Sequence, residues 1–465
     1  MSAATIAHAC AGEVVAGDIE AMASTVAIDS RDAVSGCVFF ALPGERADGH
    51  EYVGEAVRAG ARVVIVSDDG EKVREALRSA GRDHVALVKV PDVAAALLAL
   101  AAHQRSRLTC PVIGITGSTG KTTTKDFLFA ALAVAKNVVA TEGNRNNELG
   151  VPLTLLRADR ASDAVVVEMA MRGPGQIREL CAVALPTAGL VTNIGTSHIE
   201  LLGTQEAIAG AKGELIECLP HDGRAFLNAD DEWTARLRAR SKVPVTTYGT
   251  AEDADVRASG VAVDDRGRVS FMLVTPHGES RVELSVPGRH NIYNAAAAAA
   301  VGLYLGLTLA EVVEGLECAC GSPMRMEVFD TAGGVTVVND AYNANPTSMR
   351  AALLTLADMR TSGRKIAVLG DMAELGSLSD LAHFRIGEQV ARGAADIVVA
   401  VGTGARRIAE GARAEGMPAG SVHTAPDASG AVEIVRGVAK AGDIVLVKAS
   451  RVMGLEAVVE GVTSS

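Results

Sequence analysis

The chain has 465 residues, a formal net charge of −12, 48% hydrophobic and 22% charged residues, and only 3% aromatic residues. This length suggests about three domains of roughly 150 residues each, and the acidic balance argues against nucleic acid as the main partner. No apolar run reaches the roughly 18 residues needed to cross a bilayer, and the N-terminus lacks the basic start of a signal peptide, so we expect a soluble cytoplasmic protein without membrane insertion.

Residues 1–107 are predicted to form a small α/β unit that ends in an alanine-rich helix over 92–107. Apolar runs at 37–42 and 62–66 predict buried strands, with a helix over 51–59 between them. Polar residues near the ends of the first strands could hold a diphosphate or a uracil, or could serve only as a helix cap and surface charges. These residues are Ser30, Arg31, Asp48, Gly49 and His50.

Residues 111–126, PVIGITGSTGKTTTKD, combine an apolar strand, a glycine turn and a helix-like segment. Glycines let backbone N–H groups approach a phosphate, and a helix N-terminus favours anions. Lys121 would then contact the β- and γ-phosphates, and Thr122 would contact magnesium. The alternative, a tight turn with a surface lysine, is disfavoured by the strand before and the helix after. The predicted cradle comprises Gly117, Ser118, Thr119, Gly120, Lys121, Thr122 and Thr123.

A second unit is predicted over 108–318, where short Val/Ile runs alternate with helices as in a parallel sheet buried on both faces. Ligands gather at the carboxyl ends of such strands, where Glu168 and His198 stand. Glu168 could ligate magnesium directly or through water, and His198 could be a ligand or orient one. Lys212 lies in a helix-like segment facing the same region, or is a solvated lysine near Glu214.

Residues 245–287 change character and predict strands and a hairpin, an antiparallel lobe on the second unit. An alanine-rich helix is expected over 295–305. Asn294 stands one turn from Asn291 at its start, so either amide could meet the edge of an adenine.

A third unit is predicted over 319–465, where strands and helices alternate as in a doubly wound, Rossmann-like sheet. The short match at 402–404, Gly-Thr-Gly, lacks the rest of a dinucleotide fingerprint, so NAD is not expected. Pro346 suits the first position of a helix with Asn345 as its cap. Asn343 and Asn345 would then stand in a strand-to-helix turn, placed to bind a carboxylate or an amide.

The seven cysteines are scattered, and only Cys318 and Cys320 form a close pair. No second pair or nearby histidine cluster completes a zinc site. We expect reduced, buried thiols, as in a cytosol.

These motifs together resemble those of the Mur ligases, ATP-dependent amide ligases that use the shorter glycine spacing found at 117–120. Matching motifs occur in every predicted unit and cover nearly the whole chain. They are residues 28–50, GITGSTGKTTTK, 168–177, 192–215, 287–294, 324–327, 339–349 and 369–376. The run DAYNANP is similar to the branch of the family that adds a D-alanyl-D-alanine dipeptide.

The resemblance implies a three-domain architecture: a uridine-nucleotide domain (1–107), a central P-loop ATPase domain with an antiparallel lobe (108–318) and a C-terminal Rossmann-like domain that binds the dipeptide (319–465). It implies ATP and Mg²⁺, and amide bond formation in peptidoglycan synthesis. The terminal carboxylate of a UDP-MurNAc-tripeptide would take the γ-phosphoryl group, and the amine of D-alanyl-D-alanine would attack the acyl phosphate. We expect a monomer.

The resemblance also assigns roles. Lys121 would act on the phosphates, and Thr122, Glu168 and His198 would serve magnesium. Lys212 corresponds to the lysine that the family carbamylates, which would make it a carboxylate at a second metal site. Asn294, Arg325 and Asp340 would hold adenine, phosphate and ribose, and Asn343 and Asn345 would lie near the dipeptide. The first domain's Ser30, Arg31, Asp48, Gly49 and His50 would bind the UDP-MurNAc-peptide.

Two positions depart from the family: Ala449 stands where a glycine is usual, and Asn339 where many relatives have a second acid. Three rival functions are disfavoured. Folylpolyglutamate synthetase lacks the first domain. A ligase that adds a single amino acid is expected to have an Asp-Asn-Pro-Arg motif, which is absent here. A non-catalytic nucleotide-binding regulator predicts loss of Lys121, Glu168, His198 or Lys212, and all four are present.

Overall fold

The computed structural model describes residues 1–44, 47–79 and 84–463, so the predicted loop over 44–50 lies partly outside the described residues. The chain forms two compact units. The first comprises Met1–Gly114, Asn137–Met169 and Arg178–Pro186, and the second comprises Ile115–Lys136, Ala170–Ile177 and Thr187–Ser465. Both are built from helices on β-sheets, which confirms the α/β prediction. The three domain boundaries proposed from the sequence stay a prediction.

The first unit contains a five-stranded sheet in the order β1-β5-β4-β3-β2, in which only β1 is antiparallel to its neighbour. Its core consists mostly of Val and Ala side chains from these strands and from the helices on them, together with Cys37, Phe39 and Leu87. Asp92 caps α4 by accepting from the N–H groups of Ala94 and Ala95. The elements are α1 (Ala3–Ala9), β1 (Glu13–Ala16), β2 (Thr25–Ala27), β3 (Cys37–Phe40), α2 (Val53–Ala59), β4 (Val63–Val66), α3 (Glu71–Ser79), β5 (Ala86–Lys89) and α4 (Val93–Ser106).

A second sheet begins in this unit, where β7 (Val138–Ala140) runs parallel to β8 (Ala164–Glu168). Helix α6 (Gly150–Arg157) is buried along most of its length and connects them. Strand β6 (Val112–Thr116) follows β8 in the strand order, and helix α7 (Gln176–Ala184) follows β8 in the chain.

In the second unit the strand order continues from β6 as β9-β10-β11-β12-β13-β14. The predicted antiparallel lobe over 245–287 is only partly right. Strand β11 runs parallel to β10, because a helix returns the chain between them. It also pairs parallel with β12, and only β12–β14 form antiparallel hairpins. The elements are α5 (Lys121–Ala133), β9 (Ala188–Val191), α8 (Ile199–Leu202), α9 (Gln205–Glu217), β10 (Arg224–Asn228), α10 (Thr234–Arg240), β11 (Val245–Gly249), β12 (Val256–Val263), β13 (Arg268–Thr275), β14 (Gly278–Pro287), α11 (Asn291–Tyr304) and α12 (Leu309–Cys318).

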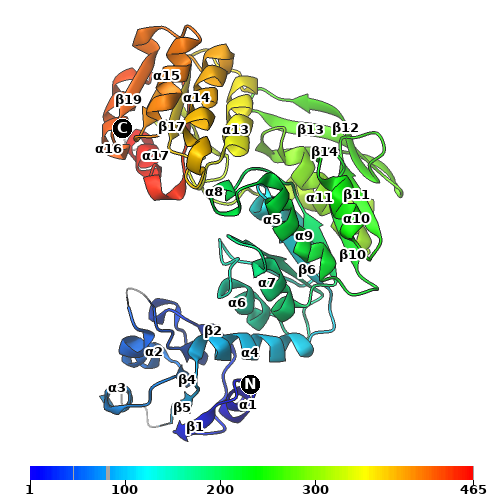
Figure 1. Cartoon of the computed structure of the whole chain (residues 1–465), viewed down its shortest axis with the longest axis vertical. Coiled ribbons are helices and arrows are strands. Elements are labelled where there is room, and N and C mark those ends of the chain that lie inside the picture. Colours follow the sequence, from blue (N-terminus) through cyan, green and yellow to red (C-terminus); the bar gives the residue numbers. More distant parts are fainter. Residues whose placement is uncertain (45–46, 80–83, 464–465) are drawn as a thin grey trace. The chain divides into compact units, whose positions relative to one another are not determined.

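The last sheet of the second unit is doubly wound, as predicted (Figure 1). Its order is β15-β16-β20-β17-β18-β19, and all pairs are parallel except β15 with β16. Neighbouring side chains alternate between two cores: Val338 packs with α13–α15, and Val337 with α16 and α17. The elements are β15 (Glu327–Asp330), β16 (Thr336–Asp340), α13 (Pro346–Asp358), β17 (Lys365–Gly370), α14 (Ser379–Gln389), β18 (Ile397–Val401), α15 (Arg406–Ala414), β19 (Val422–Ala425), α16 (Ala428–Val438), β20 (Ile444–Lys448) and α17 (Glu456–Thr463).

All seven cysteines are free thiols. The prediction that they are buried is wrong for Cys318 and Cys320, which are exposed at the end of α12 and just after it. Among residues 1–44, 47–79 and 84–463, the structure contains no helix that is both long and apolar enough to span a bilayer.

Candidate functional site

The glycine loop after β6 has the strand–turn–helix context that the sequence predicts. Gly117 and Gly120 have φ angles of 147° and 79°, which side chains rarely tolerate, and Gly120 caps α5. A Cβ on Gly117 would lie 1.9 Å from Thr192 Oγ1, and one on Gly120 would lie 2.4 Å from Asn294 Oδ1. The loop therefore requires glycine at both positions.

The loop is fastened to the segment that follows β9. The side-chain oxygen of Asn193 accepts from Thr119 N at 3.1 Å, and its amide donates to Thr119 Oγ1 at 2.8 Å. Ser118 N donates to the Asn193 carbonyl at 3.0 Å, and Gly195 N donates to Ser118 Oγ at 2.8 Å. The sequence analysis assigned no role to Asn193. These bonds fix the loop against the segment after β9.

Two predicted lysines converge on this loop. Lys121 Nζ donates to the Gly117 carbonyl at 2.8 Å, and Lys212 Nζ, from α9, donates to the same oxygen at 3.0 Å. Lys212 is 1% exposed. Burial, and then the nearby charge of Lys121, lower the pKa of Lys212 well below its ordinary value. The bland interpretation of Lys212 as a solvated lysine is therefore wrong.

Asn294 lies beside the same loop, in the first turn of α11. Its Oδ1 accepts from Thr124 Oγ1 at 3.1 Å, and its amide donates to Asn291 Oδ1 at 2.9 Å. The Asn291 amide in turn donates to the Pro287 carbonyl at 2.8 Å. Both asparagines are buried, and the bond between Asn294 and Thr124 joins α11 to α5.

His198 precedes α8 in the left-handed conformation, with φ 64°. Its Nδ1 lies 2.6 Å from Oε2 of Glu374, another non-glycine residue with positive φ. Burial outweighs that carboxylate and lowers the pKa of His198. A neutral ring that donates from Nδ1 leaves Nε2 as an acceptor, the state in which histidine binds a metal.

Glu168 ends β8 in the first unit, where it is 2% exposed. Its Oε1 accepts from Asn146 Nδ2 at 2.7 Å, while its buried Oε2 has no hydrogen-bond partner in the described part of the chain. An unsatisfied buried carboxylate oxygen suits a cation. Among the described residues, no three His, Cys, Asp or Glu side chains gather as a metal cluster. A bound Mg²⁺ would therefore rely on single protein ligands, phosphate oxygens and water, as is usual for this ion.

Arg325 lies just before β15, and Asp340 is the last residue of β16. The Arg325 guanidinium stacks on the Tyr342 ring at 4.0 Å. Asp340 Oδ2 accepts from Lys448 Nζ at 2.6 Å, and the same ammonium donates to the Asn343 carbonyl at 2.8 Å. Lys448, which is buried and was not predicted as a site residue, thus fixes the start of the predicted acceptor turn.

That turn has the predicted cap. Asn345 Oδ1 accepts from Ser348 N at 2.8 Å, with Pro346 at the first helical position of α13. The Asn345 amide donates to Ser197 Oγ at 3.0 Å, next to His198. Asn343 is exposed, and its Oδ1 accepts from Ala344 N at 2.9 Å. Both asparagines have structural roles in addition to any contact with a ligand.

The two departures from the family pattern have physical explanations. Ala449 is fully buried, and its Cβ would lie 2.6 Å from a Cβ on Gly370, so the extra methyl group fits because position 370 is glycine. The Asn339 amide donates to Glu327 Oε2 at 3.3 Å. An acid at position 339 would face that carboxylate instead.

The candidate residues of the first unit lie beside α2. Ser30 Oγ donates to Glu55 Oε2 at 3.1 Å, and the Arg31 side chain is 86% exposed and paired with Asp29. His50 bridges Asp48 Oδ1, at 2.6 Å from Nδ1, and Ser67 N, at 3.1 Å from Nε2. A Cβ on Gly49 would lie 2.6 Å from the Leu42 nitrogen. His50 and Gly49 therefore shape this loop, whereas Arg31 is open to a ligand.

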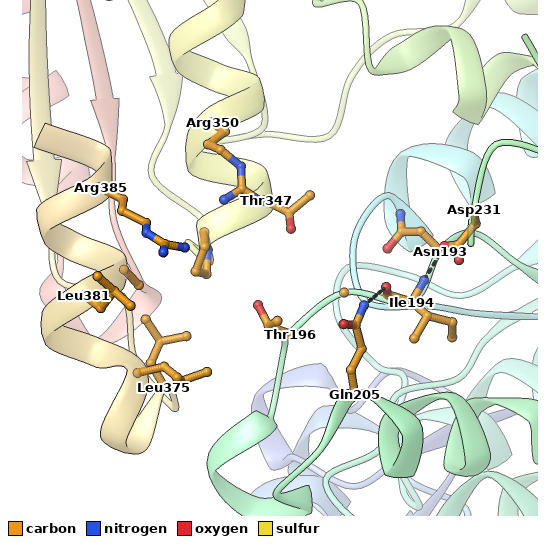
Figure 2. Close-up of a pocket in the computed structure, with 14 residues that line it drawn as sticks. Asn193, Ile194, Thr196, Gln205, Asp231, Thr347, Arg350, Leu375, Leu381 and Arg385 are labelled. Atoms are coloured by element: carbon orange, nitrogen blue, oxygen red, sulfur yellow. Dashed lines mark hydrogen bonds between the residues drawn. The ribbon is translucent and has the colours of Figure 1, made fainter. Parts of the chain in front are cut away.

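A pocket of about 430 Å³ lies within the second unit (Figure 2). Figure 2 shows Arg350, Arg385, Leu375 and Leu381 on one side, facing residues that follow β9 and β10 on the other. The sequence analysis assigned no role to either arginine. The lining residues are Asn193, Ile194, Gly195, Thr196, Gln205, Asp231, Pro346, Thr347, Arg350, Leu375, Leu378, Leu381, Ala382 and Arg385.

Three family models match the chain: the Mur ligase family catalytic domain over 23–105, the Mur ligase middle domain over 115–302, and the Mur ligase glutamate ligase domain over 324–451. The UDP-N-acetylmuramoyl-tripeptide–D-alanyl-D-alanine ligase of Mycobacterium bovis is 39% identical, with 95% of this chain and 92% of that protein covered. The crystal structure of MurF from Acinetobacter baumannii matches with a TM-score of 0.85 at 31% identity, covering 100% and 99% of the two chains. MurF from Thermotoga maritima, in complex with ADP, matches with a TM-score of 0.78 at 28% identity, covering 95% and 97%.

Proposed function

Because the chain belongs to the Mur ligase family, we propose that it joins D-alanyl-D-alanine to UDP-MurNAc-tripeptide with ATP, in cytoplasmic peptidoglycan precursor synthesis. The observation that supports this activity most directly is the convergence of Lys121 and the buried Lys212 on the Gly117 carbonyl. A polyphosphate bound at the start of α5 would replace that carbonyl as the partner of Lys121.

The reaction has two steps. An oxygen of the tripeptide's terminal carboxylate attacks the γ-phosphorus of ATP, the bond from phosphorus to the β–γ bridging oxygen breaks, and ADP leaves. The dipeptide amine then attacks the acyl carbon, loses a proton, and phosphate leaves as the amide forms. Such a reaction depends on positioning and on stabilising the charge that develops on the phosphoryl oxygens.

The glycine loop is proposed to bind ATP through Gly117, Ser118, Thr119, Gly120, Lys121, Thr122 and Thr123. Lys121 contributes a cation to the phosphates. Asn294, Arg325 and Asp340 are proposed on the adenine, phosphate and ribose. The hydrogen bonds of Asn294 and the ion pair of Asp340 keep both side chains fixed before ATP arrives.

Mg²⁺ would be held by Thr122, Glu168 and His198, and supplies neutralisation of phosphate charge when bound. The unsatisfied Glu168 Oε2 and the neutral His198 ring fit this role. Lys212 is proposed to be carbamylated. Its neutral amine can attack CO₂, losing one proton and leaving a carboxylate in place of the amine, and the lowered pKa of Lys212 provides that neutral amine.

Ser30, Arg31, Asp48, Gly49 and His50 are proposed to bind the uridine nucleotide, with Arg31 and Ser30 as the direct contacts. Asn343 and Asn345 are proposed near the dipeptide. We propose that the enzyme acts as a monomer.

The decisive experiment measures phosphate release from ATP with purified protein, Mg²⁺, UDP-MurNAc-tripeptide and D-alanyl-D-alanine, omitting each component in turn. We expect release only when all are present. Release with a single amino acid in place of the dipeptide would assign a neighbouring ligase activity. Binding of ATP with no release for any acceptor would support the non-catalytic alternative.

A further inference from the structure

Two cations line the pocket of Figure 2, Arg350 and Arg385. Arg350, on α13, and Arg385, on α14, form no ion pair and no side-chain hydrogen bond within the described residues, and both are exposed. Most other arginines near the surface of the second unit are paired, such as Arg392 with Glu415. In a chain with a net charge of −12, two unpaired guanidinium groups in one pocket provide a local site for an anion.

Apolar side chains adjoin these arginines. Leu378 and Leu381 line the same pocket and are 41% and 50% exposed. Burying a leucine side chain away from water is favourable. Leu375, which is buried, extends the surface beneath them. The anion that fits this side of the pocket therefore has small apolar groups next to its charge.

The opposite side is polar and adjoins the glycine loop. Asp231 lines it, and each of its carboxylate oxygens accepts one backbone N–H, from Ile194 at 2.7 Å and from Trp233 at 2.8 Å. Gln205 is held by its amide on the Ile194 carbonyl at 2.8 Å (Figure 2). Asn193 and Gly195, also in the lining, bond directly to Thr119 and Ser118 of the loop. One end of the pocket thus lies against the proposed phosphate site.

We propose that this pocket binds the acceptor dipeptide, with Arg350 and Arg385 on its C-terminal carboxylate and Leu378 and Leu381 against its methyl groups. This assignment rests on the proposed function and names the residues that select the acceptor. D-Alanyl-D-alanine has one carboxylate, two methyl groups and one amine. Its length, at most about 7 Å for two extended residues, lets the amine lie on the Asn193 side, toward the acyl phosphate.

The geometry also explains why a free carboxylate is selected. A planar guanidinium binds a carboxylate through two parallel hydrogen bonds, which an amide cannot accept. A dipeptide amide has one neutral carbonyl oxygen and an NH₂ donor, so it cannot neutralise the two arginines. The pocket therefore distinguishes a free dipeptide from an internal segment of a longer peptide.

The test compares D-alanyl-D-alanine with D-alanyl-D-alanine amide as acceptors, in the wild type and in Arg350→Ala, Arg385→Ala and the double variant. Each single variant should raise the KM for the dipeptide about 10- to 100-fold, the loss expected for a hydrogen-bonded charge. The KM values for ATP and UDP-MurNAc-tripeptide should stay unchanged. Arg385→Lys should be intermediate because it keeps the charge but loses the planar fork. Arg406→Ala, which removes an exposed arginine at the start of α15 outside the pocket, is the matched control.

The wild type should prefer the dipeptide to its amide, and the double variant should lose that preference. A stabilising thermal shift by the dipeptide should likewise be present in the wild type and absent in the double variant. Retained preference in the double variant, or a raised KM for UDP-MurNAc-tripeptide instead, would overturn the assignment. A wild type that ligates neither acceptor would overturn the proposed function itself, so the two failures are distinguishable.

Discussion

The cationic side chains of the glycine loop are hydrogen-bonded within the protein, whereas those of the acceptor pocket are exposed. At the loop, Lys121 and Lys212 both donate to the Gly117 carbonyl, and Asn193 fastens the loop from the other side. In the pocket, Arg350 and Arg385 have no partner among the described residues. The loop is therefore held by bonds within the protein, whereas the two pocket arginines are exposed and, within the described part of the chain, unpaired.

This difference separates catalysis from recognition. Changes at the loop disturb a preorganised arrangement, so they should act on turnover. Changes at the pocket remove contacts made only with the acceptor, so they should act on its binding.

Lys121→Ala should have the largest effect. It removes the cation proposed to face the phosphates, and loss of such charge stabilisation lowers turnover by at least about 10²- to 10³-fold. Phosphate release under saturating substrates measures this. Thermal unfolding of the variant provides the control for folding, and near-normal turnover in a folded variant would refute the ATP assignment.

Lys212→Ala should also be inactive, because it removes the side chain that is proposed to carry the carbamate. If the carbamate is the working group, a short carboxylic acid added in solution should enter the space left by the side chain and restore part of the activity. Lys121→Ala is the matched control, because no added acid should restore a missing cation. Equal responses of the two variants would contradict the carbamate proposal.

Glu374→Gln should have an intermediate effect. Glu374 Oε2 lies 2.6 Å from His198 Nδ1 and orients the ring with Nε2 free as an acceptor. Removing such a partner of a metal ligand typically weakens metal binding about 10- to 100-fold. We expect a higher Mg²⁺ concentration at half-maximal activity and a smaller Mg²⁺-dependent thermal shift.

The KM for the dipeptide should not change in Glu374→Gln, since the pocket arginines are untouched. A changed dipeptide KM with unchanged Mg²⁺ dependence would place Glu374 on the recognition side of the division.

The sequence was sufficient wherever a local rule determines structure. The cap at Asn345 with Pro346 in the first turn, the glycines of the loop, and the strands ending at Glu168, at Asp340 and before Asn193 all follow from short-range patterns. It failed for β11, because the residues of a short strand do not show whether it pairs parallel or antiparallel. The parallel pairing with β10 depends on the helix between the two strands.

Site residues that depend on partners distant in sequence could not be predicted. Asn193 holds a loop about 75 residues before it, and Lys448 meets Asp340 across more than 100 residues. Arg350 and Arg385 lie on exposed positions of two helices, where a sequence shows only solvated charge. Their significance comes from what the fold leaves unpaired, a property that no local pattern encodes.

The smallest expected effect concerns Ala449, and it tests whether that departure belongs to packing or to acceptor recognition. Gly370→Ala should destabilise the protein by about 1–3 kcal/mol, because its new Cβ would meet the Ala449 Cβ at 2.6 Å in a filled core. Ala449→Gly should cost about 1 kcal/mol by removing a buried methyl group and loosening the backbone. Together the changes should cost less than their sum, since the second relieves the clash made by the first. Urea unfolding of the four proteins measures this coupling. Additive losses in the free energy of unfolding, or a changed KM for the dipeptide in Ala449→Gly, would indicate that Ala449 acts in acceptor recognition rather than in core packing.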